Sequence, residues 1–340
     1  MTFAGATQAQ KGTEEPSTAL VESRGIALNS QTGKVYAVET RRGTVTIFDP
    51  KTKSAANVKV GAGPVAIAVN ETTNRIYVAN NEGASVSVID GKNDAVVATV
   101  NVGELPYVVA ANPASNKIYV SNTFSDVITV IDGATNSITT VKAGSADAIA
   151  VDAKLDKVYL LGYEDTNLTV MDKTPSVTGK VQVGKHPWAM ALNEATNTLY
   201  VTRVGSAELV VLNEISGATT TIPTGAFPCA VAVNPATNLV YVVNHGDDTV
   251  TVIDGTRRVV VATVKVGKGP RGVAVDAKNS RVYVANSHSG TITVIDSEQN
   301  RVLKTLKAGN NPYAVAVDPN GGQLYVVSYG EPALTVVGGH

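Results

Sequence analysis

The chain has 340 residues, of which 44% are hydrophobic and 17% are charged, and its 28 Lys and Arg residues nearly balance 29 Asp and Glu residues. Without a basic run, nucleic acid is not an expected partner. No apolar stretch reaches the roughly 18 residues that a membrane-spanning helix needs. The single cysteine, Cys229, excludes an intramolecular disulfide.

The N-terminal segment differs from the rest of the chain in being polar and without a strand pattern. We predict that residues 1–17 form a disordered or trimmed tail. They lack the charged and apolar regions of an intact signal peptide and look like the start of a mature exported protein, periplasmic or at the cell surface. Residues 18–22 (TALVE) are the only apolar alternation before Arg24, and we expect them to form a strand.

The segment 64–103 is one complete structural unit. Its four short β-branched runs, at 65–70, 75–80, 85–90 and 95–102, are separated by turns rich in Gly, Asn and Asp. This pattern predicts a four-stranded antiparallel meander.

The same unit recurs along the chain every 40 to 42 residues. A tyrosine at the start of the second strand marks each copy: Tyr36, Tyr77, Tyr119, Tyr159, Tyr200, Tyr241, Tyr283 and Tyr325. A repeat of this length built from strands is typical of a β-propeller blade. We therefore predict one all-β domain over residues 18–340, most simply with eight four-stranded antiparallel blades; the alternative is seven blades with one terminal unit displaced.

The fourth strand occurs only seven times, and the eighth unit has none after its third strand. Propellers avoid open edges by closing the ring. Residues 18–22 are therefore expected to supply the outer strand of the last blade.

Several positions are nearly constant across the repeats and have structural explanations. A small residue recurs in the first strand, where neighbouring blades converge: Ala27, Ala68, Ala110, Ala150, Ala191, Ala232, Ala274 and Ala316. An Asx residue ends the third strand, where its side chain is expected to cap the following turn: Asp49, Asp90, Asp132, Asp172, Asn213, Asp254 and Asp296. The asparagines that end the second strand are expected to cap turns in the same way.

The repeated strings identify a family resemblance. IYVAN (76–80), TVTVIDG (249–255), VVATVKVG (260–267) and GPRGVAVD (269–276) resemble the YVTN-type β-propeller repeat, which is related to the NHL repeat. The resemblance covers about residues 25–337. It implies a propeller fold of the kind found in bacterial and archaeal surface or exported proteins, and almost nothing about activity.

One variable position points to a ligand site. The connection into each first strand and the loop between strands two and three should share one face of the ring. The residue that follows the connection into each first strand varies between blades while its neighbours repeat: Arg24, Val65, Tyr107, Ala148, Trp188, Cys229, Arg271 and Tyr313. Aromatic and arginine side chains gathered at the mouth of a channel suit a planar, polar or sugar-like ligand; the alternative is that they plug the channel.

Charged and imidazole side chains add further candidates on this face. His186, His245 and His288 fall in its loops, in three consecutive blades. Imidazole is a common metal ligand and general base, but no two of these residues have a close ligand spacing, so neither a metal nor another cofactor is predicted. Glu39 and Arg203 replace the asparagine that usually ends strand two; they are either an acid and an anion clamp or solvated loop charges.

The leading functional hypothesis is a non-enzymatic propeller that binds an unknown small molecule or protein on this loop face. It rests on the absence of a nucleophile motif, a phosphate loop and a dinucleotide fingerprint. The alternative is a lyase or hydrolase of small molecules, like streptogramin lyases or lactonases, with a His/Glu site that uses a divalent ion. The candidate ligand-binding residues are Arg24, Glu39, Tyr107, His186, Trp188, Arg203, His245, Arg271, His288 and Tyr313.

Overall fold

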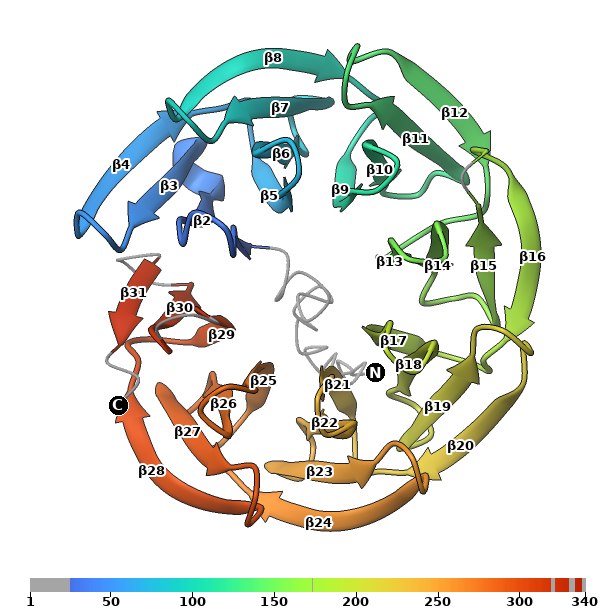
Figure 1. Cartoon of the computed structure of the whole chain (residues 1–340), viewed down its shortest axis with the longest axis vertical. Helices are drawn as coiled ribbons and strands as arrows, with labels where there is room; N and C mark the ends of the chain where they lie inside the picture. Colours follow the sequence, from blue (N-terminus) through green and yellow to red (C-terminus); the bar gives the residue numbers. More distant parts are fainter. Residues whose placement is uncertain (1–24, 173, 319–321, 330–333, 338–340) are drawn as a thin grey trace, which may run out of the picture.

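The computed structural model describes residues 25–172, 174–318, 322–329 and 334–337. Eight separate antiparallel sheets are arranged radially around one axis, in chain order (Figure 1). The predicted eight-bladed, all-β propeller is confirmed, and the alternative of seven blades is wrong. Among the described residues the only helix is the short 3-10 turn η2 (Thr40–Arg42), and no helix there could span a membrane.

Each blade runs from the axis outward in chain order. The innermost strands are β1 (Ile26–Leu28), β5 (Pro64–Asn70), β9 (Pro106–Asn112), β13 (Ala148–Asp152), β17 (Pro187–Asn193), β21 (Pro228–Asn234), β25 (Pro270–Asp276) and β29 (Pro312–Val317). The second strands are β2 (Val35–Glu39), β6 (Arg75–Asn80), β10 (Lys117–Asn122), β14 (Lys157–Leu161), β18 (Thr198–Arg203), β22 (Leu239–Asn244), β26 (Arg281–Asn286) and β30 (Leu324–Ser328). The third strands are β3 (Thr44–Asp49), β7 (Ser85–Asp90), β11 (Val127–Asp132), β15 (Asn167–Met171), β19 (Glu208–Asn213), β23 (Thr249–Asp254), β27 (Thr291–Asp296) and β31 (Leu334–Val337). The outer strands of blades 1 to 7 are β4 (Ser54–Lys59), β8 (Ala95–Asn101), β12 (Ile138–Lys142), β16 (Val177–Gln182), β20 (Thr219–Pro223), β24 (Val259–Lys265) and β28 (Arg301–Lys307).

The register of the first two strands explains two of the constant positions. In every blade the recurring alanine pairs directly with the recurring tyrosine, as Ala68 does with Tyr77 and Ala232 with Tyr241. The tyrosines are all buried. A small residue opposite a large ring lets the phenol fill the space between blades, because directly paired side chains share one face of the sheet.

The hydrophobic core lies between blades, where the faces of adjacent sheets meet. One cluster joins Tyr36 of blade 1 to Val78 of blade 2. Another joins Val35 of blade 1 to Tyr325 of blade 8, so the inner part of the ring is closed by apolar packing. The ring of Phe48 adds a contact to Tyr325 at 5.9 Å between centroids.

The predicted turn caps are confirmed at the end of the third strands. Asp254 Oδ1, for example, accepts hydrogen bonds from the backbone amides of Thr256 and Arg257. These bonds stabilise the carboxylate and lower the pKa of Asp254, and equivalent bonds lower those of Asp132 and Asp296.

The asparagines that end the second strand behave differently from the prediction. Asn244 Nδ2 donates to the hydroxyls of Thr249 and Thr251 on the neighbouring β23, rather than capping the backbone ahead of it. Asn80 makes the same bonds to Ser85 and Ser87. These amides are buried and tie strand two to strand three inside the blade.

Blade 8 contributes the three described strands β29, β30 and β31. The expected outer strand at residues 18–22, and the tail before it, lie outside the described residues, so this closure stays a prediction.

Candidate functional site

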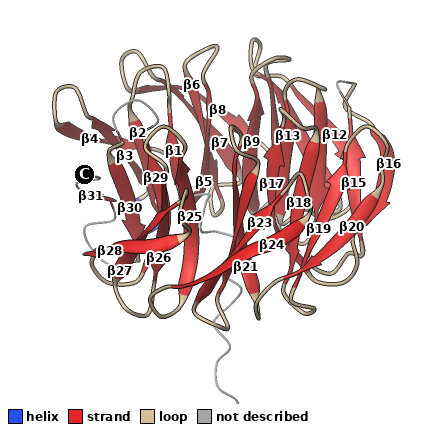
Figure 2. Ribbon diagram, turned by 60° about the horizontal axis from the view of Figure 1, so that its bottom comes forward, coloured by secondary structure: helices blue, strands red, loops and turns tan. Residues whose placement is uncertain are grey.

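Figure 2 shows the loops and turns gathered at the two ends of the disc. Two sets of loops meet on one of these faces, as predicted. The loop after strand two donates a backbone hydrogen bond to the connection that precedes strand one of the same blade. Examples are His245 N to Phe227 O at 3.0 Å and Ser287 N to Gly269 O at 2.8 Å. This face, which we call the loop face, lies at the end of the disc where the inner strands begin.

The residue before the proline of the inner strand has an unusual backbone conformation. It is left-handed in blades 2, 3 and 5 to 8, at Gly63, Leu105, His186, Phe227, Gly269 and Asn311, with φ between 49° and 62°. Glycine adopts this conformation without cost, whereas a bulky residue there is strained by about 1 kcal/mol or more. His186 and Phe227 therefore carry a local backbone cost, as Leu105 does at the same position of blade 3.

Side-chain sizes at this position are matched to the loop above it. A Cβ at Gly269 would clash with the ring of His288 at 2.5 Å, and one at Gly63 would clash with Glu82 at 2.7 Å. In blade 5 the arrangement is reversed, because His186 lies 3.2 Å from where Gly205 would carry a Cβ. In each of these blades, one large side chain fits between the connection before strand one and the loop after strand two. The position of the glycine decides which of the two segments supplies that side chain.

These choices produce a chain of rings across blades 4 to 7, which we call the aromatic arc: Tyr163, His186, Trp188, Phe227, His245 and His288. Tyr163 contacts His186 and Trp188, with centroids 5.0 and 5.4 Å apart. Phe227 then bridges Trp188 and His245, at 5.9 and 5.8 Å. His245 and His288 end the arc at 5.4 Å from each other. The structure thus brings together four of the predicted residues, His186, Trp188, His245 and His288.

The floor of the arc contains buried polar atoms without a hydrogen-bond partner among the described residues. They are Trp188 Nε1 and His186 Nδ1. Trp188 is only 4% exposed and packs between blades with Cys229 and Val243. Buried polar atoms are normally satisfied, and similar atoms occur in most blades, among them the hydroxyl of Tyr77.

His245 is held in one orientation by its neighbour blade. Its Nδ1 lies 3.1 Å from the carbonyl oxygen of Pro270, so Nδ1 carries the proton and donates it. Thr40 and Asn81, at the equivalent position in blades 1 and 2, donate in the same way to Pro64 O and Pro106 O. Burial, together with the nearby Arg271 and His288, lowers the pKa of His245, so the ring is neutral at pH 7 with Nε2 as its acceptor.

Glu39 and Arg203 do not converge on the arc. Arg203 forms an ion pair with Glu208 of the next strand at 2.6 Å, and Glu39 pairs with Arg42 at 3.2 Å and accepts a hydrogen bond from Thr46. Both side chains occupy the position of the buried asparagines and make the equivalent contact within their own blade. Their charges are thus explained by local pairing.

Of the remaining candidates, Arg271 adjoins the His245 end of the arc, because it directly follows Pro270 and contributes to the lowered pKa of His245. The others lie elsewhere on the loop face or outside the described residues. Tyr313 stacks on Tyr329 at 4.3 Å and lies against Gly25 of blade 1, across the blade 8 seam. Tyr107 and Arg271 occupy the same position of the inner strand in blades 3 and 7, both half-buried. Arg24 lies outside the described residues.

Sequence reasoning missed Tyr163 and Phe227 as members of the site. Both occupy positions of the repeat that vary between blades, like those of the predicted residues. The signal was a phenylalanine directly before the proline of a Gly-x-x-Pro connection, where blades 2 and 7 have glycine.

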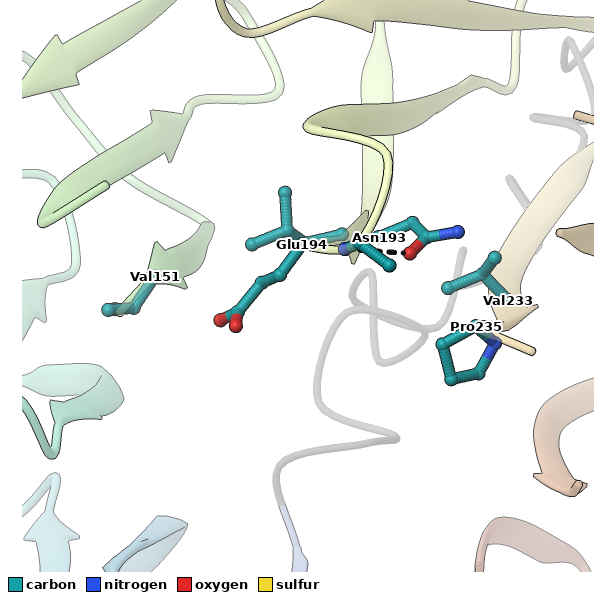
Figure 3. Close-up of a pocket in the computed structure, with 7 residues that line it drawn as sticks. Val151, Asn193, Glu194, Val233 and Pro235 are labelled. Atoms are coloured by element: carbon teal, nitrogen blue, oxygen red, sulfur yellow. Dashed lines mark hydrogen bonds between the residues drawn. The ribbon is translucent and has the colours of Figure 1, made fainter. Parts of the chain in front are cut away.

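A pocket of about 430 Å³ lies at the opposite end of the inner strands (Figure 3). Val151 on one side and Val233 and Pro235 on the other flank Asn193 and Glu194. The Glu194 carboxylate accepts a hydrogen bond from Ala153 N at 3.3 Å. None of the predicted site residues lines this pocket.

A buried carboxyl group on the same side of the disc has an unusual environment. Glu214 is 5% exposed, and its carboxyl group lies beside the side chains of Tyr159 and Asp152. It occupies the turn position at which blade 6 has Gly255, where a Cβ would contact the Tyr200 hydroxyl. Burial, with the charge of the fully buried Asp152 beside it, raises the pKa of Glu214 to about 7.

Comparison with known protein families identifies the family of this chain. Residues 1–305 match the model of the family described as "Lactonase, 7-bladed beta-propeller", and the chain belongs to that family. It departs from the family description in having eight blades. A search of curated proteins finds no match.

Solved structures share the fold. Dihydro-heme d1 dehydrogenase NirN in complex with DHE superposes with a TM-score of 0.78 at 16% identity, covering 92% of this chain and 72% of that one. Kuenenia stuttgartiensis hydrazine synthase superposes with a TM-score of 0.64 at 18% identity, covering 97% and 99%. At these identities the likeness describes architecture alone.

Proposed function

We propose that this protein binds a small molecule with a flat ring on the aromatic arc of the loop face. The observation that carries the proposal is the unbroken series of ring contacts from Tyr163 to His288, contributed by four consecutive blades. Ring faces and edges at 5 to 6 Å offer stacking surface to a planar ligand.

Two further features of the arc support a ligand. Phe227 is 41% exposed and is held in a strained conformation, although glycine serves the same backbone position in blades 2 and 7. Trp188 Nε1 and His186 Nδ1 are buried beneath the arc and have no hydrogen-bond partner within the described residues. The NirN structure, which has the same architecture, is a complex with DHE, so a propeller of this type accommodates a small-molecule ligand.

Binding can be measured through the intrinsic fluorescence of Trp188, the only tryptophan of the chain. Planar ring compounds, including a flavin, a purine nucleoside and a porphyrin, would be titrated into the protein in the presence of EDTA. We expect saturable quenching by at least one class. Phe227→Gly should weaken that binding about tenfold, since a contact aromatic contributes roughly 1–3 kcal/mol.

The matched control is Leu105→Gly, which makes the same backbone change at the same position of blade 3, outside the arc. It should leave binding unchanged. Equal loss in both variants, or no response to any planar compound, would contradict a ligand site on the arc.

A second candidate function is hydrolysis of a lactone, which membership of the lactonase family favours. Its physical basis is His245, which is neutral at pH 7 and has its tautomer fixed by Pro270 O. Nε2 would accept a proton from water as the water attacks the lactone carbonyl; the ring C–O bond then breaks, and the leaving alkoxide takes up a proton to give a hydroxy acid.

A pH-stat assay tests this second function. It measures the acid that is released when a panel of five- and six-membered lactones is hydrolysed. The rate of hydrolysis should rise with pH as His245 loses its proton, and it should reach its maximum by neutral pH because the pKa of His245 is lowered. His245→Asn should reduce kcat about 100-fold or more, while asparagine keeps the bond to the neighbouring carbonyl as Asn81 does in blade 2. Unchanged turnover in this variant would exclude His245 as the base.

A further inference from the structure

The structure shows two imidazole rings side by side at one end of the aromatic arc. His245 is half-buried at the end of blade 6, and His288 is exposed on the loop of blade 7. Their ring centroids are 5.4 Å apart with an angle of 74° between the planes. In the sequence they are 43 residues apart, so the closeness arises only from the docking of neighbouring blades.

Both rings are positioned by the connection between them. His245 Nδ1 donates to Pro270 O, and the Nδ1 edge of His288 lies against Gly269, where a Cβ would be 2.5 Å away. A backbone carbonyl that binds one ring nitrogen and leaves the other as an acceptor is the usual outer contact of a metal-binding histidine. The left-handed Gly269 is the feature that leaves space for the second ring.

The separation of the rings suits a shared ion. Two imidazoles bound to one tetrahedral ion at about 2.0–2.1 Å from each nitrogen have centroids about 5 Å apart. The observed separation is close to this value.

We propose that His245 and His288 form a two-histidine site for a borderline divalent cation, such as Zn²⁺ or Cu²⁺, on the loop face. The described residues contain no group of three or more His, Cys, Asp or Glu side chains that could hold a metal. The nearby Asp247 and Asp248 accept hydrogen bonds from Ala226 N and Gly269 N. The protein thus supplies two ligands, and the other coordination positions are open to water or to an oxygen-donor group of a bound molecule.

Titration of the full chain with Cu²⁺ and with Zn²⁺, followed by calorimetry, tests this site. We expect one equivalent of either ion to bind, Cu²⁺ more tightly than Zn²⁺. His288→Ala and His245→Asn should each weaken binding at least tenfold. The first removes an exposed side chain, and the second retains the bond to Pro270 O in the manner of Asn81, so both variants should melt near the wild type.

His186→Ala is the control, because His186 lies on the same face but contacts Tyr163 rather than this pair. It should bind metal like the wild type. The electron paramagnetic resonance spectrum of the Cu²⁺ complex should show coupling to two imidazole nitrogens. The proposal is wrong if the double variant His245→Asn/His288→Ala binds as tightly as the wild type, or if His186→Ala loses as much affinity as His288→Ala.

The metal site does not depend on the proposed function. The fluorescence titration with planar compounds is made in EDTA, and the metal titration uses the ions alone. Each can therefore fail without the other.

Discussion

Trp188 is the only tryptophan of the chain, and the structure gives it a structural role as well as a place in the arc. Its ring is 4% exposed and packs with Cys229 and Val243 across the seam between blades 5 and 6. We expect Trp188→Ala to lower the free energy of unfolding by about 3–5 kcal/mol, as for a large ring removed from a core. Urea denaturation measures this loss; a change below about 1 kcal/mol would mean that the indole is not part of the core.

Glu214 carries a cost at neutral pH that can be measured. Its pKa is raised from 4.5 to about 7 in the folded protein, so the folded state holds a proton that the unfolded chain has already lost between these values. The free energy of unfolding contributed by this group is therefore highest below pH 4.5, falls as pH rises to about 7, and stays low above it.

Replacement by the uncharged isostere isolates this effect. Glu214→Gln should be more stable than the wild type at pH 8, by roughly 1–3 kcal/mol, and should match it at pH 4. Thermal unfolding at both pH values is the measurement. A stability difference that does not change with pH would show that ionisation of Glu214 is not responsible.

At the scale of the element, a buried asparagine side chain links strands two and three of a blade and stabilises this pair of strands. Asn244 is fully buried and donates to both Thr249 and Thr251. Asn244→Ala should destabilise the protein by about 1–3 kcal/mol, because two hydroxyl groups lose a partner in the interior.

The ion pair Arg203–Glu208 takes the place of this amide in blade 5 and provides a comparison. Arg203→Asn/Glu208→Thr introduces two of the three blade 6 residues, since blade 5 has Val210 where blade 6 has Thr251. It should leave the melting temperature within a few degrees of the wild type. Chemical denaturation of Asn244→Ala and of the double variant measures both changes in stability. A large loss in the double variant would contradict the equivalence of the two arrangements.

On the scale of the whole molecule, closure of the ring is the decisive feature. Apolar packing of Val35 against Tyr325 joins the first and last blades near the axis. If residues 18–22 add the outer strand of blade 8, deletion of residues 1–24 should lower the melting temperature by 10 °C or more and expose the edge of β31 to aggregation. Calorimetry and light scattering measure both effects; identical melting of the two proteins would rule out this closure.

Much of the architecture followed from the sequence, because the repeat dictates it. Alternating β-branched residues, glycine and Asx turns, and the constant Ala and Tyr positions are local consequences of building one blade. Repetition of the blade eight times then gives the ring. The capping of turns by Asp90, Asp132 and their equivalents could be predicted because an Asx side chain reaches only the backbone beside it.

The site could be predicted only in part, and the reason is physical. The variable positions on the loop face are visible in the sequence, which is why His186, Trp188, His245 and His288 were found. Whether two of them touch depends on how neighbouring blades pack. It also depends on whether glycine stands before the inner-strand proline or in the loop after strand two. Gly269 leaves room for His288 to approach His245, whereas Phe227 lies between Trp188 and His245. The pairing of Arg203 with Glu208 likewise depends on the register of β18 and β19. Local residue patterns are therefore enough to predict the blade, its turns and the ring, whereas the side chains that meet across neighbouring blades are fixed by how the blades pack.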